Sequence, residues 1–317
     1  MKRKVVLHGS STLIISLPQE WAKKYGINKG QELDVIELDR ELRIKTENTK
    51  SIESTEINVS DFDRTAIKSY ICGAYRMGFD VITINFDDKE TTYKRLGRVV
   101  LIKDIIQEEV DRFVGMEIIS ATDHSCIIKD VSHLDQGEFD NIFRRIFLLT
   151  FDLGDSVINL MQNKEKENIE NVYSKHKTVT RLINYCLRLL NKYGYNNFRK
   201  TCTLYHIVSS LDQIVDLMKY SARNFESEKV KLDYENIRIM NEIITVLRLF
   251  YESFYKFDSM KIKEIDYKRR EIDEKFSEAT KKGINMRIIS KWQFILEIIF
   301  LMREARFGLA CLDNSTE

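Results

Sequence analysis

Two aspartates in the C-terminal half of the chain have a spacing that suits metal chemistry. Asp212 and Asp216 lie four positions apart in a helical pattern, so their carboxylates share one face of that helix. A carboxylate pair can bind a hard or borderline cation, but it supplies too few ligands by itself. Further ligands would have to come from neighbouring helices, where the candidates are Asp152, Asp155 and His176. The simpler interpretation is an exposed acidic helix face, and the sequence leaves both open.

A second set of candidates lies near the N-terminus and suits contact with phosphate groups. The candidates for DNA binding are Lys2, Arg3, Lys4, Ser10, Ser11 and Thr12. Basic side chains supply the salt-dependent attraction to a phosphate backbone, and hydroxyl groups can hydrogen-bond to it. Residues 1–47 hold nine basic and seven acidic side chains, an excess of only two. The alternative is therefore that the basic cluster is a solvated strand end and that this segment only dimerises.

The elements that must position these N-terminal residues are short. The pattern predicts four strands, over residues 4–8, 12–17, 32–38 and 42–46, and one helix over 19–25. Pro18 suits the first helical position because its missing N–H costs nothing there, and Gly26 suits the helix end. Four short strands and one short helix are too small to bury a useful core and would leave open sheet edges. We therefore expect this segment to pair with a second copy.

The run GSSTLIISLPQEWAKKYGINKGQELDVIEL, residues 9–38, resembles the AbrB/MazE/SpoVT family of swapped-hairpin domains. The shared features are the Leu-Pro pair, the following short helix and the Gly-Ile-x-x-Gly-x-x-Leu order. The resemblance covers about the first 47 residues and implies a domain at 1–48. It also implies an interlocked, dimeric β-barrel, which binds DNA in many members and serves as an antitoxin in some.

The middle of the chain has the pattern of a small α/β unit at about 60–135. Residues 47–56 are polar and aperiodic, which favours a linker or an irregular edge. The predicted elements are a helix over 60–77, a strand over 81–86, a helix that opens at Asp87 and carries the apolar residues up to Ile106, and strands over 113–120 and 126–131. Its glycines are isolated, so the unit carries no phosphate-binding glycine loop.

The remaining residues, 136–317, predict an all-helical domain. Apolar side chains recur at helical spacing over 138–162, 166–193, 198–225, 231–256, 258–281 and 284–313. Short connections favour antiparallel neighbours, and six helices can form two three-helix bundles end to end. The stretch 292–302 is apolar on all sides, which favours a central helix in its bundle.

These six helices, with Leu211-Asp-Gln-Ile-Val-Asp216 in the third, resemble the PhoU family of phosphate-signalling proteins. The resemblance implies a PhoU-like helical domain, with a metal ion (iron, zinc or magnesium) possible at Asp212 and Asp216. The corresponding stretch of the second bundle keeps Glu304 but has Gly308 in place of the aspartate, which puts a second metal site in doubt. An AbrB-like domain ahead of PhoU-like helices resembles an archaeal arrangement.

Composition excludes several classes of protein. Fifty basic residues balance 49 acidic ones, so no global positive field draws the chain to nucleic acid or membrane. Five scattered cysteines, with no C-x-x-C pair, indicate reduced thiols. The longest apolar runs are too short to span a membrane, and the basic N-terminus leads into strand-like alternation rather than a signal peptide. No nucleophile elbow, His-Glu-x-x-His or Walker motif is present, so we do not expect an enzyme.

Together these observations predict an α+β multidomain protein, cytoplasmic and homodimeric through its N-terminal barrel, with no membrane insertion. The resemblances imply a phosphate-responsive, DNA-binding transcriptional regulator of phosphate uptake. Partners implied for the helical domain are a phosphate-transport ATPase subunit or a sensor kinase. One alternative is a signalling adaptor that does not bind DNA and controls a transporter or kinase through protein contacts. A third is an antitoxin-like protein that neutralises a toxin through its helical extension.

Overall fold

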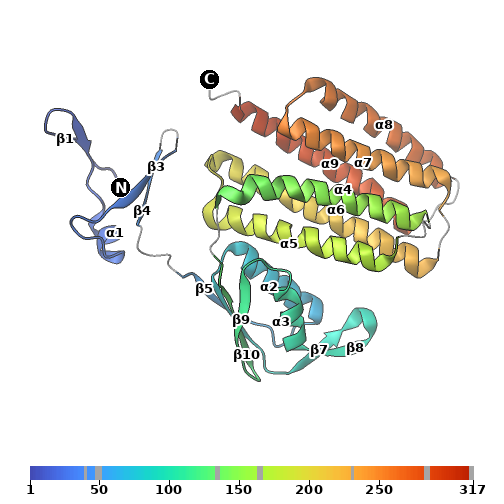
Figure 1. The fold of residues 1–317 in the computed structure, drawn as a ribbon, viewed down its shortest axis with the longest axis horizontal. Helices are drawn as coiled ribbons and strands as arrows, with labels where there is room; N and C mark the ends of the chain where they lie inside the picture. The colour runs from blue at the N-terminus through green and yellow to red at the C-terminus, as the bar shows by residue number, and fades with distance from the viewer. Residues whose placement is uncertain are drawn as a thin grey trace. The chain divides into compact units, whose positions relative to one another are not determined.

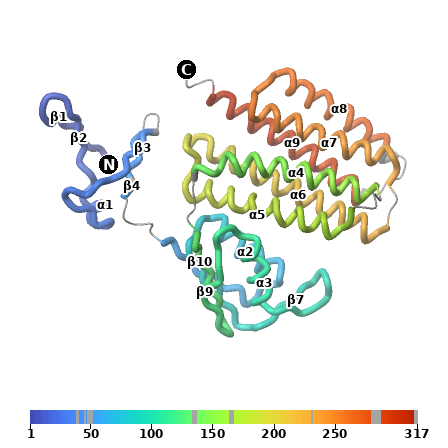
Figure 2. The backbone as a smooth tube through the Cα atoms, in the orientation of Figure 1, coloured from blue at the N-terminus to red at the C-terminus, as the bar shows by residue number. Residues whose placement is uncertain are grey.

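The computed structural model describes residues 1–38, 41–46, 52–132, 136–162, 167–229, 232–281 and 286–313. It is an α+β protein, as predicted, with N-terminal hairpins, a small sheet and a helical region (Figure 1). Figure 2 traces the same path from the N-terminal hairpins to the last helix. The chain forms two compact units, Met1–Ile52 and Glu53–Glu317. The domain boundaries predicted from the sequence stay predictions.

The first unit consists of two antiparallel hairpins and one short helix. Its elements are β1 (Val6–His8), β2 (Thr12–Ile14), α1 (Gln19–Lys24), β3 (Leu33–Leu38) and β4 (Glu41–Thr46). Pro18 stands just before α1, and its carbonyl accepts the Ala22 amide at 2.9 Å. No described side chain of this unit is buried. The described residues of this unit therefore form no core within a single chain.

The second unit begins with an α/β part built on a four-stranded sheet. Its elements are β5 (Ser54–Asn58), α2 (Arg64–Met77), β6 (Val81–Asn85), β7 (Glu90–Tyr93), β8 (Arg98–Leu101), α3 (Ile102–Val110), β9 (Met116–Ala121) and β10 (Ser125–Asp130). The strand order is β5-β6-β10-β9, with β5 and β6 parallel and the other pairs antiparallel. Inward residues of the sheet, such as Ile82 and Ile84, join buried residues of α2 and α3 in one core.

The structure corrects two sequence predictions for this part. Of the linker or irregular edge predicted at 47–56, residues 47–51 lie outside the described residues and residues 54–56 belong to β5, a regular edge strand that pairs in parallel with β6 and buries Ile57. The helix predicted from Asp87 is a β-hairpin, β7–β8, followed by the shorter helix α3. Threonine, tyrosine and valine side chains favour strands here, and Gly97, at φ +59°, takes the left-handed conformation that the turn needs.

The helical part contains the predicted helices with small shifts at their ends. They are α4 (Phe139–Met161), α5 (Ile169–Tyr193), α6 (Thr201–Glu228), α7 (Tyr234–Tyr255), α8 (Ser259–Lys281) and α9 (Met286–Asp313). Their apolar residues form one continuous core. The stretch 292–302 of α9 is only partly central: Trp292, Ile295 and Ile299 are fully buried, whereas Phe294 and Leu301 are 61% and 52% exposed. Among the described residues, no helix is both long and apolar enough to cross a membrane.

The two predicted bundles do not lie end to end. Helices α6 and α9 run antiparallel along their length, since Lys200 pairs with Asp313 at 2.7 Å and Trp292 Nε1 donates to Ser221 Oγ at 2.8 Å. Figure 1 shows α4 to α6 and α7 to α9 side by side. Helix α9 packs against both α6 and α7, which joins the two sets of three helices along their length.

Candidate functional site

The β1–β2 hairpin carries the residues predicted to contact DNA. Ser10 and Ser11 lie in the turn, next to Gly9 at φ +68°, and Thr12 pairs with His8 across the strands. Lys2, Arg3 and Lys4 precede β1 and are exposed. The turn and the basic cluster thus lie at opposite ends of a three-residue ribbon, about 10 Å apart. A phosphate backbone would have to follow the ribbon to meet both.

The same hairpin is apolar on both of its faces. Leu7 faces Leu13 across the strands, and these side chains are 60% and 69% exposed. Val6 faces Ile14 on the opposite side, and these are 60% and 43% exposed. A two-stranded ribbon is marginal in water by itself, and exposed apolar surface on both faces marks an interaction site. The hairpin therefore needs a protein layer on each side.

The structure places Asp212 and Asp216 on α6, where each carboxylate already has cationic or imidazole partners. Asp212 Oδ2 accepts a hydrogen bond from Arg76 Nη2 of α2 at 2.6 Å. Asp216 Oδ1 accepts one from Lys219, and His176 Nε2 of α5 lies 2.8 Å away. One candidate ligand, His176, is thus brought to the pair, and its neutral ring can donate through Nε2–H.

Charges and burial around Asp216 shift three pKa values. Burial tends to raise the pKa of Asp216, but the hydrogen bonds from His176 and Lys219 outweigh it and hold that pKa well below its usual value. Burial lowers the pKa of His176, against the opposing effect of Asp216. Burial likewise lowers the pKa of Lys219, although Asp216 opposes it. At neutral pH these shifts favour an ionised carboxylate at Asp216 and a neutral imidazole at His176.

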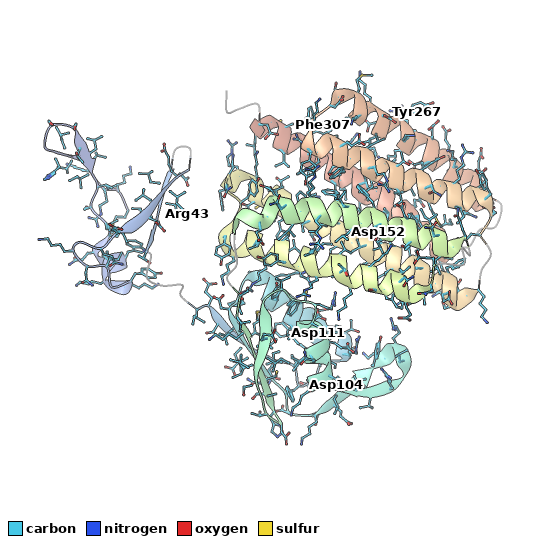
Figure 3. The ribbon with its side chains drawn as sticks, viewed as in Figure 1. Arg43, Asp104, Asp111, Asp152, Tyr267 and Phe307 are labelled. Atoms are coloured by element: carbon cyan, nitrogen blue, oxygen red, sulfur yellow. The ribbon has the colours of Figure 1, made fainter. Side chains whose placement is uncertain are left out.

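The other predicted ligands lie elsewhere. Asp152, on α4 and labelled in Figure 3, is held by Lys175 at 2.8 Å, and Asp155 by Arg248 at 2.9 Å. In the part of the chain that the structure describes, no group of three or more His, Cys, Asp or Glu side chains could hold a metal ion. Around Asp212 and Asp216 the only further candidate ligand among the described residues is His176, and the cations Arg76 and Lys219 already occupy the carboxylates, so the residues present do not form a metal site by themselves. The metal assignment stays a prediction.

Sequence reasoning missed a buried arginine that joins α5 to the α/β part. Arg188 is fully buried and donates to the carbonyls of Tyr75 and Phe79 and to Asp130 Oδ2, each at 2.9 Å. Its guanidinium carbon also lies 4.8 Å from the Tyr75 ring centre. The available signal was a single basic residue inside the apolar run Cys186-Leu-Arg-Leu-Leu190. This network fixes α2 and β10 to the helical part.

Comparison with known proteins assigns only the N-terminal unit. Residues 6–51 match the family model described as antidote-toxin recognition MazE, bacterial antitoxin. The chain therefore carries a MazE/AbrB-type domain at its N-terminus, and domains of this type typically dimerise and bind DNA. No curated protein and no solved structure matches the chain. The family match ends at residue 51 and gives no support to the PhoU-like resemblance of the helices.

Proposed function

We propose that this protein is a homodimeric, DNA-binding transcriptional regulator that acts through its N-terminal unit. The observation that carries the proposal is the β1–β2 hairpin, which is apolar on both faces and lies within the segment matched by the MazE family model. A second copy would cover those faces and complete a core. The dimer would then present two sets of Lys2, Arg3 and Lys4, each with the hydroxyl groups of the turn at the other end of its ribbon. Such groups contact phosphates without reading sequence.

The second unit would be the regulatory part. Its resemblance to PhoU supports a response to phosphate and control of phosphate-uptake genes, with a phosphate-transport ATPase subunit or a sensor kinase as partner. The network of Arg188 supports a relay, because it couples the helices directly to the α/β part that follows the N-terminal unit. The predicted metal at Asp212 and Asp216 belongs to this proposal, and so does the absence of enzymatic activity.

The experiment that tests DNA binding measures the affinity of the full chain for duplexes from upstream of its own gene and of phosphate-transport genes. We would compare the wild type with Lys2→Ala/Arg3→Ala/Lys4→Ala at several salt concentrations. The matched control is Lys23→Ala/Lys24→Ala/Lys29→Ala, which removes three exposed charges from the same unit. Binding that falls steeply with salt and is lost only in the first variant supports the proposal.

A dimer that binds none of these duplexes above a mixed-sequence control would refute the proposal and favour the adaptor. A second candidate follows from the printed description of the family model, which is an antitoxin. In that case a toxin should co-purify with the chain in a fixed stoichiometry, which a pull-down with size-exclusion chromatography would detect.

A further inference from the structure

The β7–β8 hairpin is separate from the four-stranded sheet and lies at the margin of the α/β part (Figure 1). Its strands pair from Glu90 with Leu101 to Tyr93 with Arg98, and the turn between them contains Lys94, Arg95 and Leu96. Every residue from 94 to 99 is exposed. The turn is thus a projecting, accessible ribbon end that takes no part in the core.

This hairpin concentrates positive charge in a chain whose net charge is only +1. Residues 89–103 contain five basic side chains and a single acidic one, Glu90. Two carboxylates from outside the hairpin touch these cations: Asp63 contacts Lys94 at 3.3 Å, and Asp123 contacts Lys89 at 2.8 Å and Lys103 at 3.5 Å. Three of the five cations are therefore paired, which leaves Arg95 and Arg98.

Of these two arginines, Arg95 lies within the turn and Arg98 is the first residue of β8. Within the described residues, neither Arg95 nor Arg98 forms an ion pair, and Arg95 lies 5.4 Å from the ring centre of Tyr93. Guanidinium groups present planar donor pairs that match phosphate oxygens. Leu96 stands between them and is 52% exposed. Apolar side chains at such a position can contact the groove of a duplex.

Acidic side chains at the base of the hairpin limit the contact to its turn. A pocket there is lined by Asp61, Asp88 and Glu90, among other residues. The lining of the pocket extends to Asp63 and Lys94, and Asp63 pairs with Lys94 at 3.3 Å. The carboxylates therefore reach the first residue of the turn, and the surface left for a phosphate backbone is that of Arg95 and Arg98.

We infer that the β7–β8 turn is a second contact to the DNA phosphate backbone, made by Arg95 and Arg98. The inference rests on the proposed function, because it adds to DNA binding by the N-terminal unit. A weak contact on a chain that is already tethered to DNA acts at a high effective concentration and adds affinity without reading sequence. A dimer would contribute two such turns.

The test measures binding of the full-length dimer to a fluorescein-labelled, mixed-sequence duplex by anisotropy titrations from low to physiological salt. The duplex has about 30 base pairs, which is long enough for the several phosphate contacts of a dimer. The variant is Arg95→Ala/Arg98→Ala, and Arg95→Lys/Arg98→Lys keeps the charge. The matched control, Lys263→Ala/Arg270→Ala, removes two exposed charges from α8. Each lost phosphate contact should reduce the slope of log K against log salt by about 0.9, hence by about 1.8 per protomer.

The inference holds if the alanine variant loses this slope while the lysine variant and the α8 control keep it. It fails if the alanine variant binds with an unchanged slope while the Lys2/Arg3/Lys4 variant loses DNA binding. In that case the proposed function survives alone. A wild type that binds no duplex overturns both. Thermal unfolding of each variant, equal to that of the wild type, confirms that the comparison concerns binding. Retention of the wild type on anionic vesicles but not on DNA would also overturn it.

Discussion

Replacing Arg188 with methionine is expected to destabilise the second unit by about 3–5 kcal/mol, the usual cost of breaking a buried ion pair. Arg188 is fully buried, and the Asp130 side chain is 5% exposed. Methionine has a similar length but no charge and no donors. The substitution would leave the Asp130 carboxylate in a dry environment, with Ser132 as its one remaining side-chain or backbone donor among the described residues. It would also remove the Arg188 donors from the carbonyls of Tyr75 and Phe79, although the Gly78 N–H at the end of α2 would still donate to Tyr75.

A second substitution separates the charge from the packing. Asp130→Asn keeps an acceptor for Ser132 but removes the negative charge. The double variant Arg188→Met/Asp130→Asn buries no unpaired charge. Its loss of unfolding free energy should therefore be smaller than the sum of the two single losses by about 1–3 kcal/mol. The exposed pair of Lys175 and Asp152 provides the control, since Lys175→Met should cost about 1 kcal/mol or less.

The assay is urea unfolding of the full chain, followed by tryptophan fluorescence in a Trp21→Phe background. The chain has two tryptophans, and Trp292 is fully buried in the helical core, so the remaining signal reports the second unit. Because Trp292 lies on α9 and Arg188 on α5, a shifted midpoint also shows that the unit unfolds cooperatively. A change below about 1 kcal/mol for Arg188→Met, or strict additivity in the double variant, would refute the reasoning.

Three further predictions test packing, pH dependence and dimerisation. Gly154→Ala would place a Cβ 2.5 Å from Ile244 Cδ1 and should destabilise the protein by about 1–3 kcal/mol. Gly73→Ala meets open space and should stabilise α2 by about 0.4–1 kcal/mol. Equal melting temperatures of these two variants would contradict both predictions. The pKa of His176 is lowered in the folded state from the ordinary histidine value of 6.5. Below pH 6.5 the unfolded chain therefore binds more protons than the folded protein, and stability should fall as the pH drops through 6.5. The pKa of Asp216 is also lowered in the folded state, so this carboxylate contributes to stability above about pH 4. That contribution is lost at more acidic pH. His176→Gln should flatten the first decline in melting temperature between pH 7 and 5, and an unchanged profile would argue against it. Leu13→Asp, on the exposed hairpin face, should weaken dimerisation at least about tenfold in analytical ultracentrifugation, while Leu148→Asp on α4 should not.

The sequence predicted the helices of the second unit well because helical periodicity is local. Apolar side chains at steps of three and four define a helix face whatever that face later contacts, and the ends of α4 to α9 lie within a few residues of the prediction. The hairpin β7–β8 was missed because β-pairing depends on a partner strand as well as on the segment itself. Ser54–Asn58 is similar, since it becomes a strand only by pairing with β6, about 27 residues later.

The candidate sites divide in the same way. The residue types and spacing determined that Asp212 and Asp216 share a helix face, and that Lys2, Arg3 and Lys4 precede an alternating strand. Only the tertiary structure decided that Asp212 meets Arg76, 136 positions earlier in the chain, and that Asp216 meets His176, 40 positions earlier. Charge pairing between distant segments depends on how the helices pack, because side-chain contacts reach only a few ångströms. A sequence pattern therefore fixes which groups share a face, and packing fixes what they touch.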